Sequence, residues 1–263
     1  RSRSLADKNI QCFEIQIPTE APLTWDDHQV FNTGLMPAAV YLVMGLAAGE
    51  RLFASSYGLG SVTLHEGLWL DPSAPTQVQT LIKREDQNTY TFEIYSSPPK
   101  TAQKTSEENW IHHVTGTLQN SSTPSEFSLE LAEIRQLMRD SRPASRIYSQ
   151  FSERGIDYGP SFQGSKQVWS GSTTDVLASI ELPSACDSQA TAFLLHPVLL
   201  DAGLQVAGIT LSEMGGSYLP IEIEQFNRYQ PLPKGELWVY AQQRMTDKST
   251  NSAERESSKS VVI

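Results

Sequence analysis

The chain has 263 residues, 39% of them hydrophobic and 9% aromatic, which is enough for a packed core in one large domain or two small fused ones. Its 30 acidic residues against 20 lysines and arginines give a formal net charge of −10. This excess disfavours a nucleic-acid partner, because phosphate binding needs clustered cations. No apolar run approaches the roughly 20 residues of a membrane-spanning helix, so we expect no membrane span and a cytoplasmic protein.

The start of the chain and its two cysteines add two expectations. Residues 1–4 lack the apolar core of a signal peptide and are more typical of a cut within a longer polypeptide. Cys12 and Cys186 lie far apart and form no CxxC pair. That usage is typical of reduced thiols in a cytoplasmic protein, although a single disulfide stays open.

The first half of the chain predicts two strands and a buried helix. Residues 12–17 and 90–95 alternate between apolar and polar side chains, as a strand with one buried face does. Residues 37–49 are apolar nearly all round, which predicts a helix buried on most sides. Pro37 suits its first turn and Gly49 its end. Two polar stretches predict surface loops, residues 97–109 and 119–126.

The second half repeats this outline. A break at residues 139–145 could link the two halves, and residues 176–182 predict another strand. His196 and Pro197 then precede a second mostly apolar stretch, residues 201–209. Residues 246–260 carry many charges and almost no apolar side chain, which predicts a long exposed loop or a disordered tail.

Two buried helices, each wrapped by an antiparallel sheet, make an α+β protein. We predict an N-terminal half over residues 1–140 and a C-terminal half over residues 146–263, joined as one pseudo-dimeric domain.

Four stretches resemble motifs of a known family. Residues 28–37 resemble HxxxGxxxxP, with His28 and Pro37 in place and Asn32 where the family has glycine. Asparagine is among the best substitutes if that backbone has a positive φ, so we expect an altered loop shape rather than lost activity. Three further motifs follow in the family's order: YGPxF at residues 158–162, HPxxLDxxxQ at residues 196–205 and LPxxI at residues 219–223.

The chain therefore resembles, over essentially its whole length, the dehydratase domain of a modular type I polyketide synthase. The resemblance implies a double hot-dog fold, which is two helix-in-sheet units fused side by side. It also implies that residues 261–263 stop where the family continues into further strand, so that the end is truncated or unobserved.

The resemblance implies that His28 and Asp201 are catalytic, as base and acid, and remove water from a 3-hydroxyacyl chain to give a 2-enoyl thioester. This hydro-lyase chemistry needs a base for the α proton and an acid for the departing hydroxide. Histidine is the usual base near neutral pH. An exposed aspartate with a pKa of ~3.9 holds no proton to donate. The apolar neighbours of Asp201 predict a desolvated site that raises its pKa.

Five further residues are candidates for substrate binding or for support of the pair. Gln205 lies four positions after Asp201, on the same helix face, and could orient its carboxyl. Tyr158 could donate to that carboxyl or to the substrate hydroxyl, and Phe162 could line the pocket. We hypothesise that the Gly34 N–H and the start of the helix at Pro37 stabilise the thioester oxygen.

The resemblance implies no cofactor of the domain's own, because the substrate is carried on the phosphopantetheine arm of an acyl carrier protein. The expected partners are this carrier and the neighbouring synthase domains, and a homodimer stays open. We expect no metal, since the adjacent His112 and His113 would point to opposite faces of a strand. The alternatives are a cyclase forming a pyran or furan ring, a double-bond isomerase, and a catalytically decayed scaffold domain.

Overall fold

The computed structural model describes residues 2–4, 9–19, 25–52, 57–87, 89–97, 110–120, 130–171, 174–211, 218–229, 232–246 and 258–262. The helices within them are α1 (Ala38–Leu52), α2 (Leu131–Leu137), α3 (Ala144–Ser152) and α4 (Pro197–Thr210), with 3-10 turns η1 (Trp25–Asp27), η2 (Pro160–Phe162) and η3 (Ser184–Gln189). The strands are β1 (Ser2–Ser4), β2 (Ile10–Ile17), β3 (His28–Val30), β4 (Thr33–Gly34), β5 (Tyr57–Leu64), β6 (Thr76–Arg84), β7 (Thr89–Ser97), β8 (Ile111–Asn120), β9 (Asp140–Pro143), β10 (Ile156–Tyr158), β11 (Ser165–Ser170), β12 (Asp175–Ile180), β13 (Glu222–Asn227), β14 (Leu237–Thr246) and β15 (Ser258–Val262).

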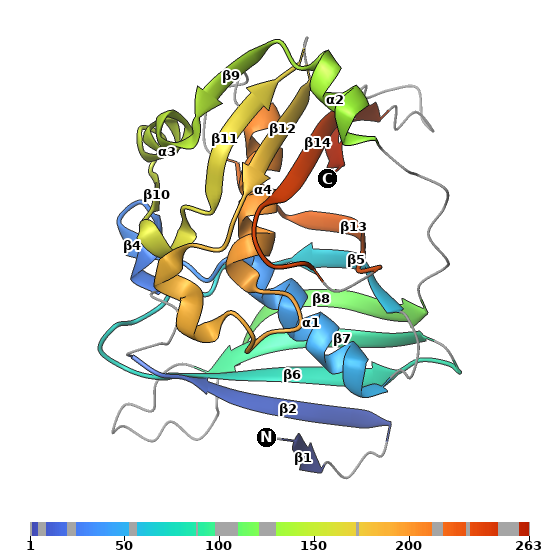
Figure 1. The fold of residues 1–263 in the computed structure, drawn as a ribbon. Coiled ribbons are helices and arrows are strands. Elements are labelled where there is room, and N and C mark those ends of the chain that lie inside the picture. The colour runs from blue at the N-terminus through green and yellow to red at the C-terminus, as the bar shows by residue number, and fades with distance from the viewer. Residues whose placement is uncertain are drawn as a thin grey trace, which may run out of the picture.

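A seven-stranded antiparallel sheet forms the first layer, in the order β1-β2-β6-β7-β8-β5-β13, with α1 lying across it (Figure 1). Alternate residues of β6 are buried, so one face of the sheet points inward. Val78 of β6 and Phe92 and Ile94 of β7 are fully covered there, in one core with Leu42 and Leu46 of α1. The apolar sequence of α1 is explained by this position.

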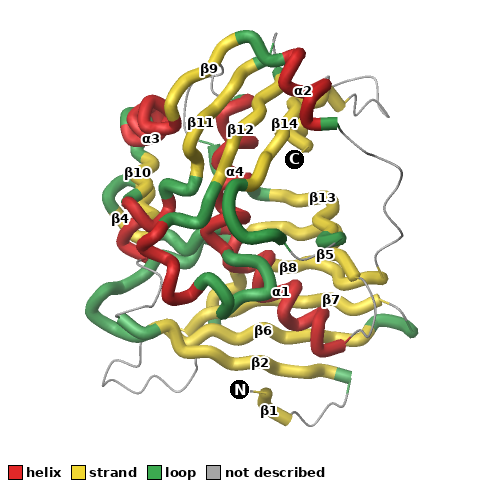
Figure 2. Tube along the Cα trace, in the orientation of Figure 1, coloured by secondary structure: helices red, strands yellow, loops and turns green. Residues whose placement is uncertain are grey.

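A five-stranded antiparallel sheet, β15-β14-β12-β11-β9, forms the second layer and contacts α4 through β12 and β14. The two helices also contact each other. Figure 2 separates the yellow strands into these two sheets and shows α1 and α4 in red. The predicted α+β class is confirmed. None of the helices in the described part of the chain is both long and apolar enough to cross a membrane.

Several boundaries differ from those predicted. The break expected at residues 139–145 contains β9, and the tail expected at residues 246–260 ends in β15, which pairs with β14. β13 follows α4 in the chain yet pairs with β5 at the end of the first sheet (Figure 1). The division into halves at residues 140–146 stays a prediction. The predicted loops at 97–109 and 119–126 lie mostly outside the described residues.

The predicted end of the first helix at Gly49 is wrong, because α1 continues to Leu52. A Cβ atom at Gly49 would lie 2.4 Å from the ring of Tyr57. The Tyr57 hydroxyl in turn donates to the carbonyl of Leu46 at 2.6 Å. The glycine therefore lets β5 approach the helix closely, and does not mark a stop.

Candidate active site

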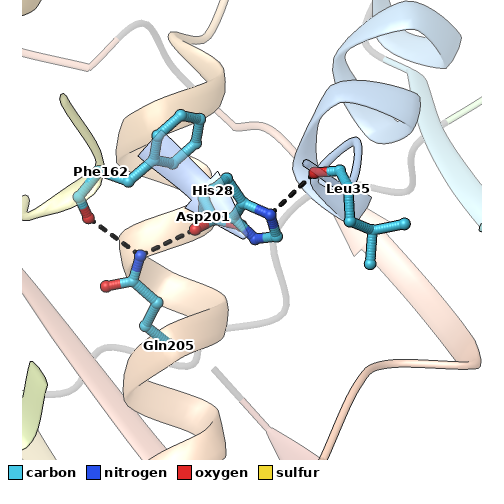
Figure 3. Close-up of polar contacts among 5 residues, drawn as sticks. All are labelled: His28, Leu35, Phe162, Asp201 and Gln205. Carbon is cyan, nitrogen blue, oxygen red and sulfur yellow. Dashed lines mark hydrogen bonds and ion pairs between the residues drawn. The ribbon is translucent and has the colours of Figure 1, made fainter. Parts of the chain in front are cut away.

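His28 lies on β3, in a separate small sheet with the order β10-β3-β4, where it pairs with Tyr158 of β10. Its Nδ1 is 2.8 Å from the carbonyl oxygen of Leu35 (Figure 3). A carbonyl only accepts, so Nδ1 carries the hydrogen and Nε2 of the neutral ring is unprotonated. That Nε2 lies 4.0 Å from Oδ1 of Asp201. The structure thus brings together the two residues that sequence reasoning placed in acid–base roles.

Asp201 lies in the second turn of α4 and is buried. Burial raises the pKa of its carboxyl, and the nearby His28 and the hydrogen bond from Gln205 only partly offset that effect. The N-cap of α4 is His196, whose Nδ1 accepts from the Val198 N–H at 3.3 Å, so Asp201 does not cap the helix. Burial lowers the pKa of His196 to about 4, which keeps this ring neutral and fits a structural role.

Gln205 fixes which oxygen of Asp201 holds the proton. Its Nε2 donates to Asp201 Oδ2 at 2.8 Å and to the Phe162 carbonyl at 3.0 Å (Figure 3). An amide nitrogen has two hydrogens, and both are used in this way. Because Oδ2 already accepts, the proton of the neutral carboxyl belongs on Oδ1, the oxygen nearer His28. The 4.0 Å from Oδ1 to Nε2 exceeds hydrogen-bond length, which leaves room for reacting atoms between them.

The pair opens into a cavity of about 210 Å³. Tyr158 lines it and meets the His28 ring edge-on, with centroids 5.4 Å apart. Burial raises the pKa of the Tyr158 hydroxyl well above its usual value, so the phenol stays protonated. Phe162 is fully buried and also meets the His28 ring edge-on, with ring centroids 5.4 Å apart, and it is not among the residues that line the cavity.

Gly34 and Pro37 do not line the cavity, whereas their neighbours Met36 and Ala38 do. Gly34 lies in β4, and its carbonyl accepts from the Leu70 N–H at 2.9 Å. Pro37 is buried directly before α1. The hypothesis about the Gly34 N–H therefore receives no support from this geometry.

Sequence reasoning missed several cavity residues on the helices and the loops beside them. On α1, Ala38 and Tyr41 line it at a spacing of three residues. Residues 64–67, Phe151 of α3 and residues 218–221 supply other walls. The helical spacing was readable in the sequence, and residues 219–221 belong to the LPxxI motif named above. That this segment reaches the cavity was not predicted, because its approach depends on the pairing of β13 with β5.

The β3–β4 turn explains the asparagine in the first motif. Phe31 has φ +49° and Asn32 has φ +62°, the pattern of a two-residue hairpin turn with both central residues left-handed. The positive φ considered for Asn32 is therefore confirmed. The Phe31 N–H donates to the Gly155 carbonyl at 2.7 Å, which ties the turn to the residue before β10.

Asp27, directly before His28, joins β3 to the segment that follows Tyr158. Its Oδ2 accepts from the Ser161 N–H at 2.9 Å and its carbonyl accepts from the Gly159 N–H at 2.7 Å. A Cβ atom at Gly159 would overlap the Asp27 side chain, so a larger residue there would displace this carboxylate. No local pattern predicts the bond between Asp27 and Ser161, because these residues are 134 positions apart.

We expect Asp27→Ala to lower the free energy of unfolding by about 1–3 kcal/mol and to lower kcat, because Phe162 and Gln205 lose their fixed position. Asp27→Asn keeps an oxygen that can accept from the Ser161 N–H, so it should retain most of the wild-type free energy of unfolding and most of kcat. Steady-state kinetics below the unfolding temperature of each variant check this. A wild-type kcat in the alanine variant would mean that Asp27 contributes to stability alone.

His113 and the two cysteines have structural surroundings. His113 is buried between Ser96 Oγ at 2.7 Å and the Glu66 carbonyl at 2.8 Å, and burial lowers its pKa. Within the described ranges, no cluster of three or more His, Cys, Asp or Glu side chains could hold a metal ion. Cys12 and Cys186 are both buried and form no disulfide.

Comparisons with known proteins agree with this geometry. A family model described as polyketide synthase dehydratase N-terminal domain matches residues 128–263, and one described as polyketide synthase dehydratase domain matches residues 1–97. Polyketide synthase GfsE of Streptomyces halstedii is 29% identical over 75% of the chain. The chain spans only 5% of the length of GfsE.

Two solved structures of the CurK dehydratase are similar, both described as inactive mutants. One, with a histidine changed to phenylalanine, has a TM-score of 0.81 and 30% identity, and the match covers 92% of this chain and 84% of that one. The other, with an aspartate changed to asparagine, has a TM-score of 0.83 and 29% identity, covering 99% and 96%. The chain belongs to the polyketide synthase dehydratase family, and its fold is the predicted double hot-dog.

Proposed function

We propose that this chain removes water from a 3-hydroxyacyl thioester to give a 2-enoyl thioester. The observation that carries the proposal is the 4.0 Å between the unprotonated Nε2 of His28 and Oδ1 of the buried Asp201. A base and an acid at this separation can reach adjacent carbons of one chain. The inactive histidine and aspartate mutants of the CurK dehydratase support the same two roles.

In the proposed step, His28 Nε2 takes the α proton, and the electron pair of that C–H bond forms the double bond. The β C–O bond breaks as Asp201 gives its Oδ1 proton to the hydroxyl, which leaves as water. Turnover leaves an imidazolium beside a carboxylate, and the proton returns from His28 to Asp201 before the next cycle. Because both groups face one cavity, the proton and the hydroxyl leave from the same face of the chain.

Three further groups support this step. As the α proton leaves, negative charge builds on the thioester oxygen, and the N-terminal end of α1 borders the cavity at Ala38. The positive end of that helix dipole stabilises such charge. Tyr158 keeps its proton and can donate to the substrate hydroxyl. Gln205 holds Asp201 with its proton on the side of the substrate.

The substrate would be carried on the phosphopantetheine arm of an acyl carrier protein, so that the domain needs no cofactor of its own. The partners would be that carrier and the neighbouring synthase domains. Membership of the family and the match to one small part of a long synthase support this. Whether two copies of the domain pair stays a prediction.

The test is to incubate the protein with synthetic 3-hydroxyacyl pantetheine thioesters of both hydroxyl configurations and to follow product mass and structure. We expect one configuration to lose a single water and yield an alkene. Unchanged mass for both would contradict the proposal and favour a scaffold role. A ring in the product of a substrate with a second, distal hydroxyl would show that cyclisation follows dehydration.

A further inference from the structure

One stripe of α4 faces the active-site cavity. Asp201, Leu204, Gln205 and Gly208 all line it, at spacings of three, four and seven residues, which place them on one side of a helix. The stripe is about 10 Å long at the rise of an α-helix. The cavity therefore extends along α4, from the acid at one end to a glycine at the other.

The fold itself does not require a glycine at position 208. A Cβ atom there would lie 3.8 Å and 3.9 Å from the ring of Phe151, which is ordinary van der Waals contact. Gly208 does not have the left-handed backbone that favours glycine, and it lies within the last turn of α4. Alanine is the better helix former, so neither packing nor backbone conformation explains a glycine here. We therefore look for its role in the cavity that it lines.

The acid–base pair gives a bound chain its direction. With His28 as base and Asp201 as acid, the α carbon of a bound chain would lie at His28 and the β carbon at Asp201. The thioester carbonyl would then lie on the side of His28, where Ala38 at the start of α1 also lines the cavity. The carbons beyond the β position then run along α4 toward Gly208. The walls there are apolar, with Leu204 and Phe151 inside the cavity. Three further lining residues, Tyr218, Leu219 and Ile221, are apolar side chains that are also exposed to solvent.

We propose that Gly208 determines which acyl chains the site accepts, by leaving space for the carbons beyond the β position. The substrate class is then a 3-hydroxyacyl thioester with a medium or long apolar tail. This inference rests on the proposed dehydratase function, since His28 and Asp201 set the direction of the chain. A side chain at position 208 would fill the space and restrict the site to short substrates.

The experiment compares kcat/KM for 3-hydroxybutyryl and 3-hydroxyoctanoyl pantetheine thioesters in the wild-type protein and three variants. In Gly208→Leu, we expect the octanoyl value to fall at least about tenfold while the butyryl value stays within about twofold. Gly208→Ala should lie between the leucine variant and wild type. The matched control is Gly203→Ala, on the same helix but not lining the cavity, with no atom within 4 Å of an added Cβ; it should keep the wild-type ratio.

Equal losses of kcat/KM for both substrates would overturn the inference. They would mean that Gly208 contacts the pantetheine arm, which both substrates share, or that it has a structural role. An unchanged ratio in both Gly208 variants would overturn it as well. Gly208→Ala keeps the test available if the leucine variant does not fold. A wild-type protein that dehydrates neither thioester would contradict the proposed function instead. Calorimetric binding of the octanoyl thioester would then still test Gly208, with at least about tenfold weaker binding expected in Gly208→Leu.

Discussion

Asp201→Asn is expected to lower kcat by about 10²- to 10⁴-fold, the usual contribution of a general acid. Asparagine keeps the size of the side chain and an oxygen that can accept from Gln205 Nε2. It has no acidic proton to give to the departing hydroxyl. The measurement is single-turnover dehydration of a 3-hydroxyacyl pantetheine thioester, which separates the chemical step from substrate binding. A rate near that of the wild-type protein would show that Asp201 is not the acid.

The pH dependence of stability provides the control for this variant. Burial raises the pKa of folded Asp201 above the 3.8 of an exposed aspartate, so the folded state holds this proton more tightly than the unfolded chain. The resulting stabilisation is fully present below 3.8 and is lost as pH rises through the raised folded pKa. Asparagine has no such proton. The free energy of unfolding of Asp201→Asn, relative to wild type, should therefore increase with pH, and denaturant titrations at several pH values measure it.

The site was predictable where its parts are close in sequence. Gln205 follows Asp201 by four residues, and helical geometry alone put the two side chains on one face. The pairing of His28 on β3 with Asp201 on α4 came only through the family motifs. Neither periodicity nor composition relates two residues that lie so far apart in the chain.

The rest depended on contacts between distant segments. Gly49 is typical of a helix end in the sequence, but the structure explains this glycine by the close approach of the Tyr57 ring. β13 belongs to the first sheet although it follows α4, and no local pattern states which edge a strand joins. The same holds for Asp27, whose carboxylate accepts from the backbone of Ser161. Such long-range pairings are what the structure adds.

His28→Ala is expected to lower kcat by about 10²- to 10⁴-fold as well, by loss of the base rather than the acid. Imidazole added to the solution should partly restore this variant, since it can enter the space left by the ring and accept the α proton. The same addition should do nothing for Asp201→Asn. The measurement is the rate of dehydration against imidazole concentration for both variants.

Two further experiments distinguish the roles of His28 and Asp201: hydrogen exchange at the α carbon of the substrate, and the rate of the double variant. The base is intact in Asp201→Asn, so the α hydrogen of the substrate should exchange with deuterium from the solvent, as seen by mass, whereas His28→Ala should show no exchange. Retained exchange in His28→Ala would contradict the assignment of the base. Because complete elimination needs both the acid and the base, the double variant should be about as slow as either single one. A double variant slowed by the product of the two single effects would mean that His28 and Asp201 work independently, against the coupling that their 4.0 Å separation implies.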